Sequence, residues 1–154
     1  MKKNILVIAS HNVGKISEIR DMLNKYKLNL KISSDFNIEE PDEDGKTFEE
    51  NALLKSKLTS EKSGFLAISD DSGLCIKSLN GEPGIYSSRL AGKKKNFKLA
   101  MEKLNKRLSI HKDKSCKFVC ALSLCWPNGE NITVRGEIHG TFTWPPKGKK
   151  GFGY

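Results

Sequence analysis

The first segment with the residue types for phosphate chemistry is the run Ser10-His11-Asn12-Val13-Gly14-Lys15, which follows a short apolar stretch. Backbone N–H groups at the start of a helix attract anions, Gly14 permits close approach, and Lys15 adds a positive charge. This pattern predicts a phosphate cradle. It is not a Walker A loop, because Ala9 stands five positions before Gly14 and Ile16 occupies the magnesium-binding Ser/Thr position. An ordinary strand-to-helix turn is the alternative.

A second segment combines an acidic loop, 35–46, with the helical pattern behind it. Clustered carboxylates such as Glu43 could hold a hard cation through oxygen, although a hydrated surface loop has the same composition. Thr47 followed by Glu50 predicts a capping box and a helix that runs to about residue 60. One face of that helix mixes aromatic, amide, small and amine side chains, which is unusual for a purely structural helix: Phe48, Asn51, Ala52 and Lys55.

The third segment is Asp70-Asp71-Ser72-Gly73, which stands between the apolar runs 65–69 and 74–76. Adjacent acids where a strand ends could support magnesium-assisted phosphate chemistry, because a carboxylate can both hold the ion and orient a water. Neighbouring residues of an extended chain point in opposite directions, so Asp70 and Asp71 are not expected to share one role. An Asp-rich turn that interrupts two strands is the alternative.

Periodicity predicts the elements that must position these residues. The helical stripes are Ile16, Ile19, Leu23 and Tyr26, and Phe97, Ala100, Met101, Leu104 and Leu108. Strands are expected at 5–9, 28–32, 65–69 and 117–126, where Phe118, Cys120, Leu122 and Leu124 share one face, and the turn at 127–129 predicts an antiparallel hairpin. The fold class is therefore mixed α/β, in one domain spanning 1–154.

Composition narrows the possible partners. The chain has 27 Lys and Arg against 18 Asp and Glu, a formal charge of +9, so a polyanion is the first partner to consider. A nucleic-acid partner is not expected, since the lysine clusters lack interleaved aromatic residues. Membrane association is not expected either, because no apolar stretch approaches the ~20 residues of a membrane span, and we expect a cytoplasmic protein. Cys116, Cys120 and Cys125 lie in an apolar stretch, which favours reduced thiols.

Taken together and in this order, the three segments resemble the inosine triphosphate pyrophosphatase family, which hydrolyses non-canonical purine nucleoside triphosphates. The resemblance continues through 79–92 and reaches the final run Gly151-Phe152-Gly153-Tyr154. It implies an elongated α/β fold with two lobes flanking a substrate cleft, a Mg²⁺ cofactor, and a homodimer. It also implies hydrolysis of ITP, dITP and XTP to the monophosphate and pyrophosphate.

The same resemblance implies roles for individual residues. Glu43 and Asp71 would hold the metal, and Asp71 would also accept a proton from water. The residues implied to contact substrate are Ser10, His11, Asn12, Val13, Gly14, Lys15, Lys55, Ser72, Phe152, Gly153 and Tyr154.

The sequence departs from the family in two respects. Ser88, Leu90 and Ser56 replace the usual Ala, Tyr and Ala, which we expect to adjust packing. The family's chains also continue past the Gly-Phe-Gly-Tyr run with a lysine and a Ser-His-Arg segment that contact the nucleotide, whereas this sequence stops at Tyr154. A truncated nucleotide-binding remnant with weak or no catalysis is therefore the alternative expectation.

Overall fold

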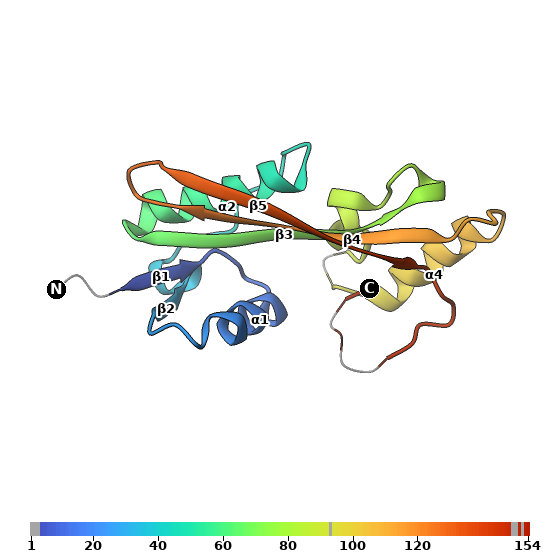
Figure 1. Cartoon of the computed structure of the whole chain (residues 1–154), viewed down its shortest axis with the longest axis horizontal. Helices are drawn as coiled ribbons and strands as arrows, with labels where there is room; N and C mark the ends of the chain where they lie inside the picture. The colour runs from blue at the N-terminus through green and yellow to red at the C-terminus, as the bar shows by residue number, and fades with distance from the viewer. Residues whose placement is uncertain (1–3, 93, 149–150, 152) are drawn as a thin grey trace. The chain divides into compact units, whose positions relative to one another are not determined.

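The structure is a computed structural model that describes residues 4–92, 94–148, 151 and 153–154. Its strands form one five-stranded sheet in the order β2-β1-β3-β4-β5, shown in Figure 1. The strands are β1 (Ile5–Ile8), β2 (Asn29–Ile32), β3 (Leu66–Ile76), β4 (Ser115–Cys125) and β5 (Asn131–Thr141). The longer helices are α1 (Val13–Leu23), α2 (Phe48–Ser63) and α4 (Phe97–Leu108), and α3 (Ser87–Leu90) is one short turn. The predicted mixed α/β class is confirmed.

The chain divides into two compact units. The first comprises residues 1–71 and 121–135, and the second comprises 72–120 and 136–154. The unit boundaries fall within β3, β4 and β5, so each of these strands contributes residues to both units. One domain spanning 1–154 stays a prediction.

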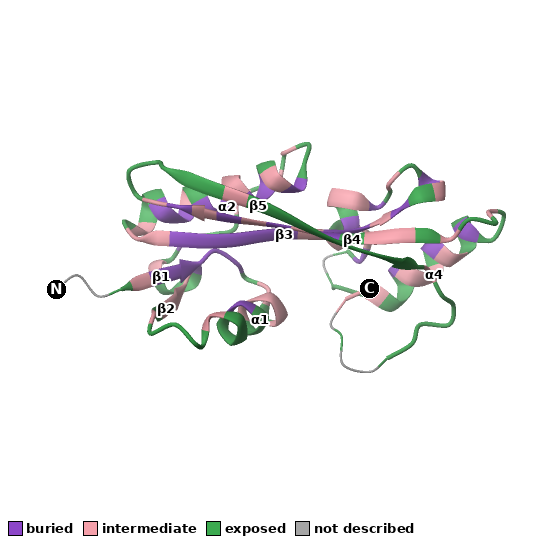
Figure 2. Ribbon diagram, in the orientation of Figure 1, coloured by how far each residue is buried: buried purple, intermediate pink, exposed green. Residues whose placement is uncertain are grey.

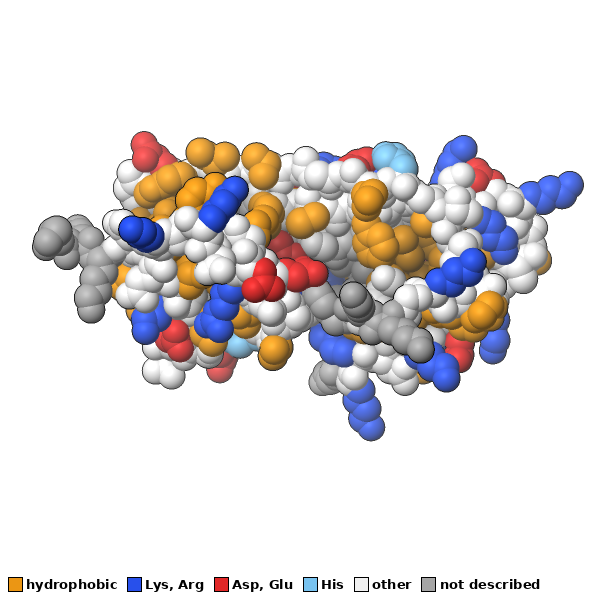
Figure 3. Space-filling view, turned by 60° about the horizontal axis from the view of Figure 1, so that its bottom comes forward, with side chains coloured by type: hydrophobic (Ala, Val, Ile, Leu, Met, Phe, Trp, Pro, Cys, Tyr) orange, Lys and Arg blue, Asp and Glu red, His pale blue; other side chains and the backbone are white. Residues whose placement is uncertain are grey.

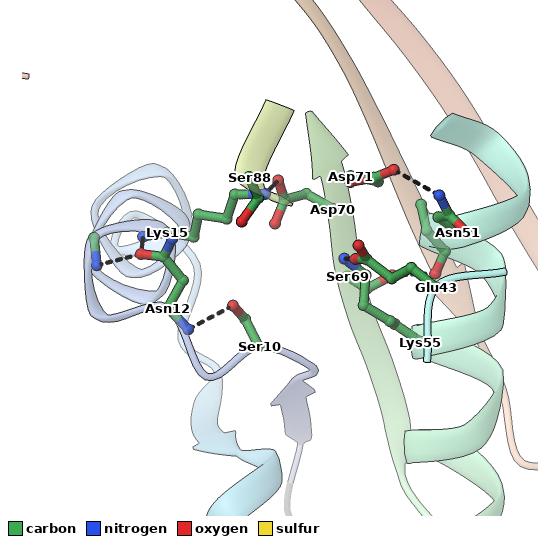
Figure 4. Close-up of polar contacts among 12 residues, drawn as sticks. Ser10, Asn12, Lys15, Glu43, Asn51, Lys55, Ser69, Asp70, Asp71 and Ser88 are labelled. Carbon is green, nitrogen blue, oxygen red and sulfur yellow. Dashed lines mark hydrogen bonds and ion pairs between the residues drawn. The ribbon is translucent and has the colours of Figure 1, made fainter. Parts of the chain in front are cut away.

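The first unit is built on parallel strands, with β1 pairing β2 on one side and β3 on the other. Leu6, Ile8 and Ile68 project from one face of β1 and β3 and pack with Ile19 of α1. Val7 and Ala67 have the opposite parity and are completely buried. Helices α1 and α2 lie on opposite sides of β3 (Figures 1 and 4).

The second unit has its own apolar core. Leu74 and Ile76 of β3 pack with Leu104 and Leu108 of α4 and with Leu79 of a 3₁₀ turn. The predicted α4 stripe is confirmed, because its buried residues are Ala100, Leu104 and Leu108.

Several predictions about elements were wrong in detail. Strand β3 is continuous, so the predicted interruption at 70–73 does not occur. Helix α1 ends at Leu23, and Tyr26 is exposed instead of extending the buried stripe. By contrast, the prediction that Phe118 and its alternate neighbours share a face of β4 is confirmed, and the fully buried residues lie on the other face, at Val119, Ala121, Ser123 and Cys125. Figure 2 shows the contrast between buried β3 and largely exposed β5.

Candidate functional site

Two acidic residues in the middle of β3 organise the candidate site, which belongs to the first unit. Asp70 and Asp71 are both buried, at 6% and 5% exposure, even though carboxylates are rarely buried without partners. Successive side chains of a strand point to opposite faces. Asp70 therefore lies on the α1 side with Ile68, and Asp71 lies on the α2 side with Ala67, as Figure 4 shows for the two aspartates.

On the α1 side, the predicted phosphate cradle does form the start of a helix. Asn12 caps α1, with Oδ1 accepting hydrogen bonds from the N–H groups of Gly14 at 3.0 Å and Lys15 at 3.3 Å. The Ser10 hydroxyl accepts from the Asn12 N–H at 3.1 Å. Lys15 Nζ lies 2.6 Å from Asp70 Oδ2, so this ion pair holds the lysine against β3. His11 and Val13 are exposed.

On the α2 side, an amide and a second ion pair surround Asp71. Asn51 Nδ2 donates to Asp71 Oδ2 at 3.1 Å, and Lys55 Nζ lies 2.5 Å from Glu43 Oε1 (Figure 4). Thr47 caps the helix as predicted by accepting from the Glu50 N–H. Glu50 Oε2 accepts from Lys46 N–H, not from the cap residue itself, so the capping box forms only on the Thr47 side.

The electrostatics of the α2 side follow from burial. Burial raises the pKa of Asp71 to about 6, and the negative charge of Glu43 adds to that rise, while Lys55 and the Asn51 hydrogen bond oppose it. For Lys55, burial lowers the pKa, but the attraction of Glu43, Asp71 and Asp70 outweighs that effect and raises it above its usual value. Lys55 is therefore a buried cation at neutral pH, and Asp71 is a carboxylate that gains proton affinity from its surroundings.

The oxygen donors on the α2 side fit Mg²⁺. Glu43 and Asp71 repel each other electrostatically, and burial disfavours the negative charge of Asp71. A cation bound between the two carboxylates would offset both effects. Within the described residues, no three or more His, Cys, Asp and Glu side chains gather to hold a metal by themselves. Magnesium is commonly held by one or two carboxylates together with water and substrate phosphates, so this donor set is sufficient.

The remaining predicted site residues belong to the second unit. Ser72 is half-buried. The Tyr154 hydroxyl donates to the Ser87 carbonyl at 2.7 Å, and its ring meets Phe97 edge-on at 5.2 Å. Burial raises the pKa of Tyr154 to about 12. A Cβ added at Gly153 would lie 4.0 Å from the Phe97 ring, and Phe152 lies outside the described residues. The roles of these residues in nucleotide binding stay predictions.

Sequence reasoning missed three features of the site. It left Asp70 without a role, whereas Asp70 pairs with Lys15. It noted Asn51 as part of a mixed helix face without assigning its contact to Asp71. It also missed the hydrogen bond that Ser69 donates to the Ala52 carbonyl. Strand parity was the available signal, because residues 67, 69 and 71 must share the face that α2 covers.

The first unit also has a small pocket, which Lys55 of the candidate site lines. His11 and Lys55 line it together with Glu39, Glu40 and Thr59. Its position brings the predicted cradle residue His11 and the predicted phosphate-binding residue Lys55 to one hollow.

The chain is basic, with a formal charge of +9. On the face drawn in Figure 3, the coloured Lys and Arg side chains are scattered.

Among helices in the described residues, none combines the length and hydrophobicity that crossing a bilayer requires.

Comparisons with known proteins identify relatives along almost the whole chain. The sequence model of the Ham1 family matches residues 6–154. The dITP/XTP pyrophosphatase of Zymomonas mobilis is 45% identical over 152 residues, covering 97% of this chain and 73% of the relative. That of Rhodospirillum centenum is 46% identical over 152 residues, covering 97% and 75%. The chain thus spans about three quarters of the length of these relatives.

Solved structures show the same likeness. A HAM1 protein from Coxiella burnetii superposes with a TM-score of 0.88 at 33% identity, covering 97% of this chain and 78% of that one. The Ham1 protein of Staphylococcus aureus gives a TM-score of 0.85 at 38% identity, with the same coverage of 97% and 78%.

Proposed function

The chain belongs to the Ham1 family, and on that premise we propose that it hydrolyses non-canonical purine nucleoside triphosphates. The substrates are dITP, XTP and ITP, the products are the monophosphate and pyrophosphate, and the reaction depends on Mg²⁺. One observation carries the proposal: the buried Asp71 carboxylate lies among Asn51, Lys55 and Glu43 in a chain whose relatives are named dITP/XTP pyrophosphatases.

The residues of the first unit have complementary tasks in this proposal. Lys15 and the start of α1 bind the triphosphate, and Lys55 adds positive charge from the α2 side. Glu43 and Asp71 hold Mg²⁺, which supplies charge neutralisation and orientation of the phosphate oxygens when bound. Asp71 accepts the proton of the attacking water, a role open to a carboxylate that stays ionised beside a bound cation. Positioning and charge supply most of what phosphoryl-type displacement needs.

The remaining roles rest on the family resemblance. Ser72 contacts the substrate, and the segment ending at Tyr154 lines the nucleotide site, where an aromatic ring can stack on a base. The protein works as a cytoplasmic homodimer. Size-exclusion chromatography with light scattering measures the molar mass directly. A monomeric mass at the protein concentration used in the activity assay would contradict the dimer.

Pyrophosphate release, coupled to an inorganic pyrophosphatase and read as phosphate, tests the reaction. We expect kcat/KM for ITP, dITP and XTP to exceed that for ATP by about tenfold or more, since a site that reads a polar group discriminates strongly. A chelator should abolish turnover and added Mg²⁺ should restore it. Equal, metal-independent turnover of ATP and ITP would contradict the proposal, and nucleotide binding without turnover would favour the remnant alternative.

A further inference from the structure

Asn51 lies in the first turns of α2 and is fully buried, which is costly for an amide unless both ends are hydrogen-bonded. We propose that Asn51 is a positioning residue that joins the Glu43-bearing loop to the Asp71 carboxylate. The catalytic part of this inference rests on the proposed function. The bridge itself can be measured without any catalytic activity.

Both ends of the Asn51 amide are used. Its Oδ1 accepts a hydrogen bond from the Gly45 N–H at 2.9 Å, and its Nδ2 donates to Asp71 Oδ2 at 3.1 Å. Only one orientation of the amide satisfies both partners, because the reverse would set an NH₂ group against an N–H and an oxygen against a carboxylate. One side chain therefore sets the position of the loop backbone and the orientation of the carboxylate together.

Gly45 fits the bridge so closely that a side chain has no room there. A Cβ at residue 45 would lie 2.5 Å from Asn51 Oδ1 and 2.9 Å from Glu50 Cβ, closer than real Cβ atoms come. The glycine thus lets the loop backbone reach the amide, two residues after the predicted metal ligand Glu43.

The turn that carries Asn51 is itself held in place. Ser69 of β3 donates a hydrogen bond to the carbonyl of Ala52, the next residue of the helix, and Thr47 caps the helix at its start. Asn51 is consequently fixed relative to the strand that carries Asp71. Because the amide is neutral, it orients the carboxylate without adding the positive charge that a lysine would bring.

Three variants separate the two halves of the bridge. Asn51→Ala removes both hydrogen bonds. Asn51→Asp keeps an acceptor for the Gly45 N–H but replaces the amide donor to Asp71 by a carboxyl group, which when ionised sets a second negative charge against Asp71. Gly45→Ala disturbs the loop half from outside the helix. Ser56→Ala is the matched control, since Ser56 is a fully buried polar residue of the same helix that bonds Ser123 instead.

Two readouts are needed, steady-state kinetics and hydrogen exchange at the Gly45 amide, each on variants whose fold is checked by circular dichroism. We expect Asn51→Ala to lower kcat about 10–100-fold with KM changed less than about threefold, the scale of lost outer-shell support. Asn51→Asp should lower kcat as much while leaving the Gly45 amide protected. Ser56→Ala should leave kcat and Gly45 protection unchanged.

The combined variant gives a further check. If Asn51 and Gly45 act through one bridge, Asn51→Ala with Gly45→Ala should be no slower than the worse single variant by more than about twofold. Multiplicative losses, or an unchanged kcat in Asn51→Ala, would overturn the inference. Should Asn51→Ala fail to fold, Gly45→Ala alone decides it, and normal kcat there overturns it.

Failure of the proposed function gives a different pattern. A wild-type chain with no pyrophosphatase activity overturns both the proposed function and the catalytic part of this inference. The bridge is then judged by exchange alone: a Gly45 amide exposed in Asn51→Ala but protected in Ser56→Ala supports it, and equal protection in both overturns it.

Discussion

Strand β3 carries two neighbouring aspartates, one on each face, and the two have different partners. Asp70 faces α1 and forms a 2.6 Å ion pair with Lys15, whereas Asp71 faces α2 and accepts a hydrogen bond from the neutral Asn51. The cation on the α2 side, Lys55, forms an ion pair with Glu43 and also attracts Asp71, which opposes the rise of the Asp71 pKa. Asp70 is thus matched by a full positive charge, while the pKa of Asp71 rises to about 6 through burial and the repulsion of Glu43.

This difference shows that the partners of a buried carboxylate act together with its burial on its affinity for protons. Both side chains are nearly equally buried. A buried charge with an opposite charge beside it is stabilised, but one held by an amide keeps an affinity for protons and cations. Variants on each side of β3 can break or sharpen this difference.

The largest expected effect is on turnover. Asp71→Asn should lower kcat by about 10³-fold, because it removes both a proton acceptor and a metal-binding oxygen while keeping the shape of the side chain. Asp70→Asn should lower kcat by only about tenfold, through the freed Lys15. Coupled pyrophosphate release measures both. Equal losses in the two variants would erase the distinction between the two sides.

The next effect is on stability in the absence of metal. Asp71 has a folded-state pKa of about 6 against 3.8 as its reference, so its protonation favours the folded state fully below about pH 4, and that contribution is lost as pH rises through 6. The difference in unfolding free energy between metal-free Asp71→Asn and wild type should therefore change with pH. Between low pH and pH 8 it should shift in favour of the variant by about 2–3 kcal/mol. Chemical denaturation in chelator at several pH values measures this. A difference in unfolding free energy that does not change with pH would show that the charge of Asp71 does not destabilise the folded state.

A smaller effect concerns the ion pair on the α1 side. Lys15 and Asp70 should couple by about 1–3 kcal/mol in a double-mutant cycle of Lys15→Met and Asp70→Asn, since the pair is largely shielded from water. Urea unfolding of the four proteins gives the coupling. The exposed pair Lys77 and Asp113 supplies the control, for which we expect a much smaller coupling because solvent screens both charges. A coupling as small as that of the control would remove the structural role of Asp70.

The smallest effect compares the helix caps on the two sides. Thr47→Ala and Asn12→Ala should each lower stability by about 1 kcal/mol, because each leaves N–H groups of a helix start without an acceptor. Thr47→Ala should leave KM for nucleotide unchanged, whereas Asn12→Ala should raise it, since Asn12 lies in the predicted phosphate cradle. Thermal unfolding and steady-state kinetics measure the two properties. A raised KM in Thr47→Ala alone would reverse the assignment.

Much of the fold was predictable from local patterns. The α4 stripe, the Thr47 cap and the short strand at 29–32 follow from periodicity and capping chemistry, which act within a few residues. The continuity of β3 was not predictable. Two acids, a serine and a glycine are typical of a turn, and only the partners supplied by α1 and α2 make it possible to bury the acids within one 11-residue strand.

The sequence by itself determined which residue types are present, their order, and the opposite directions of Asp70 and Asp71, because strand parity is a property of the backbone. Only the tertiary structure decided that the lysine of one helix would pair with Asp70 and the amide of another with Asp71. Those contacts join residues 55 and 20 positions apart in the chain, a separation at which packing of helices on a sheet selects the partners and local propensity does not.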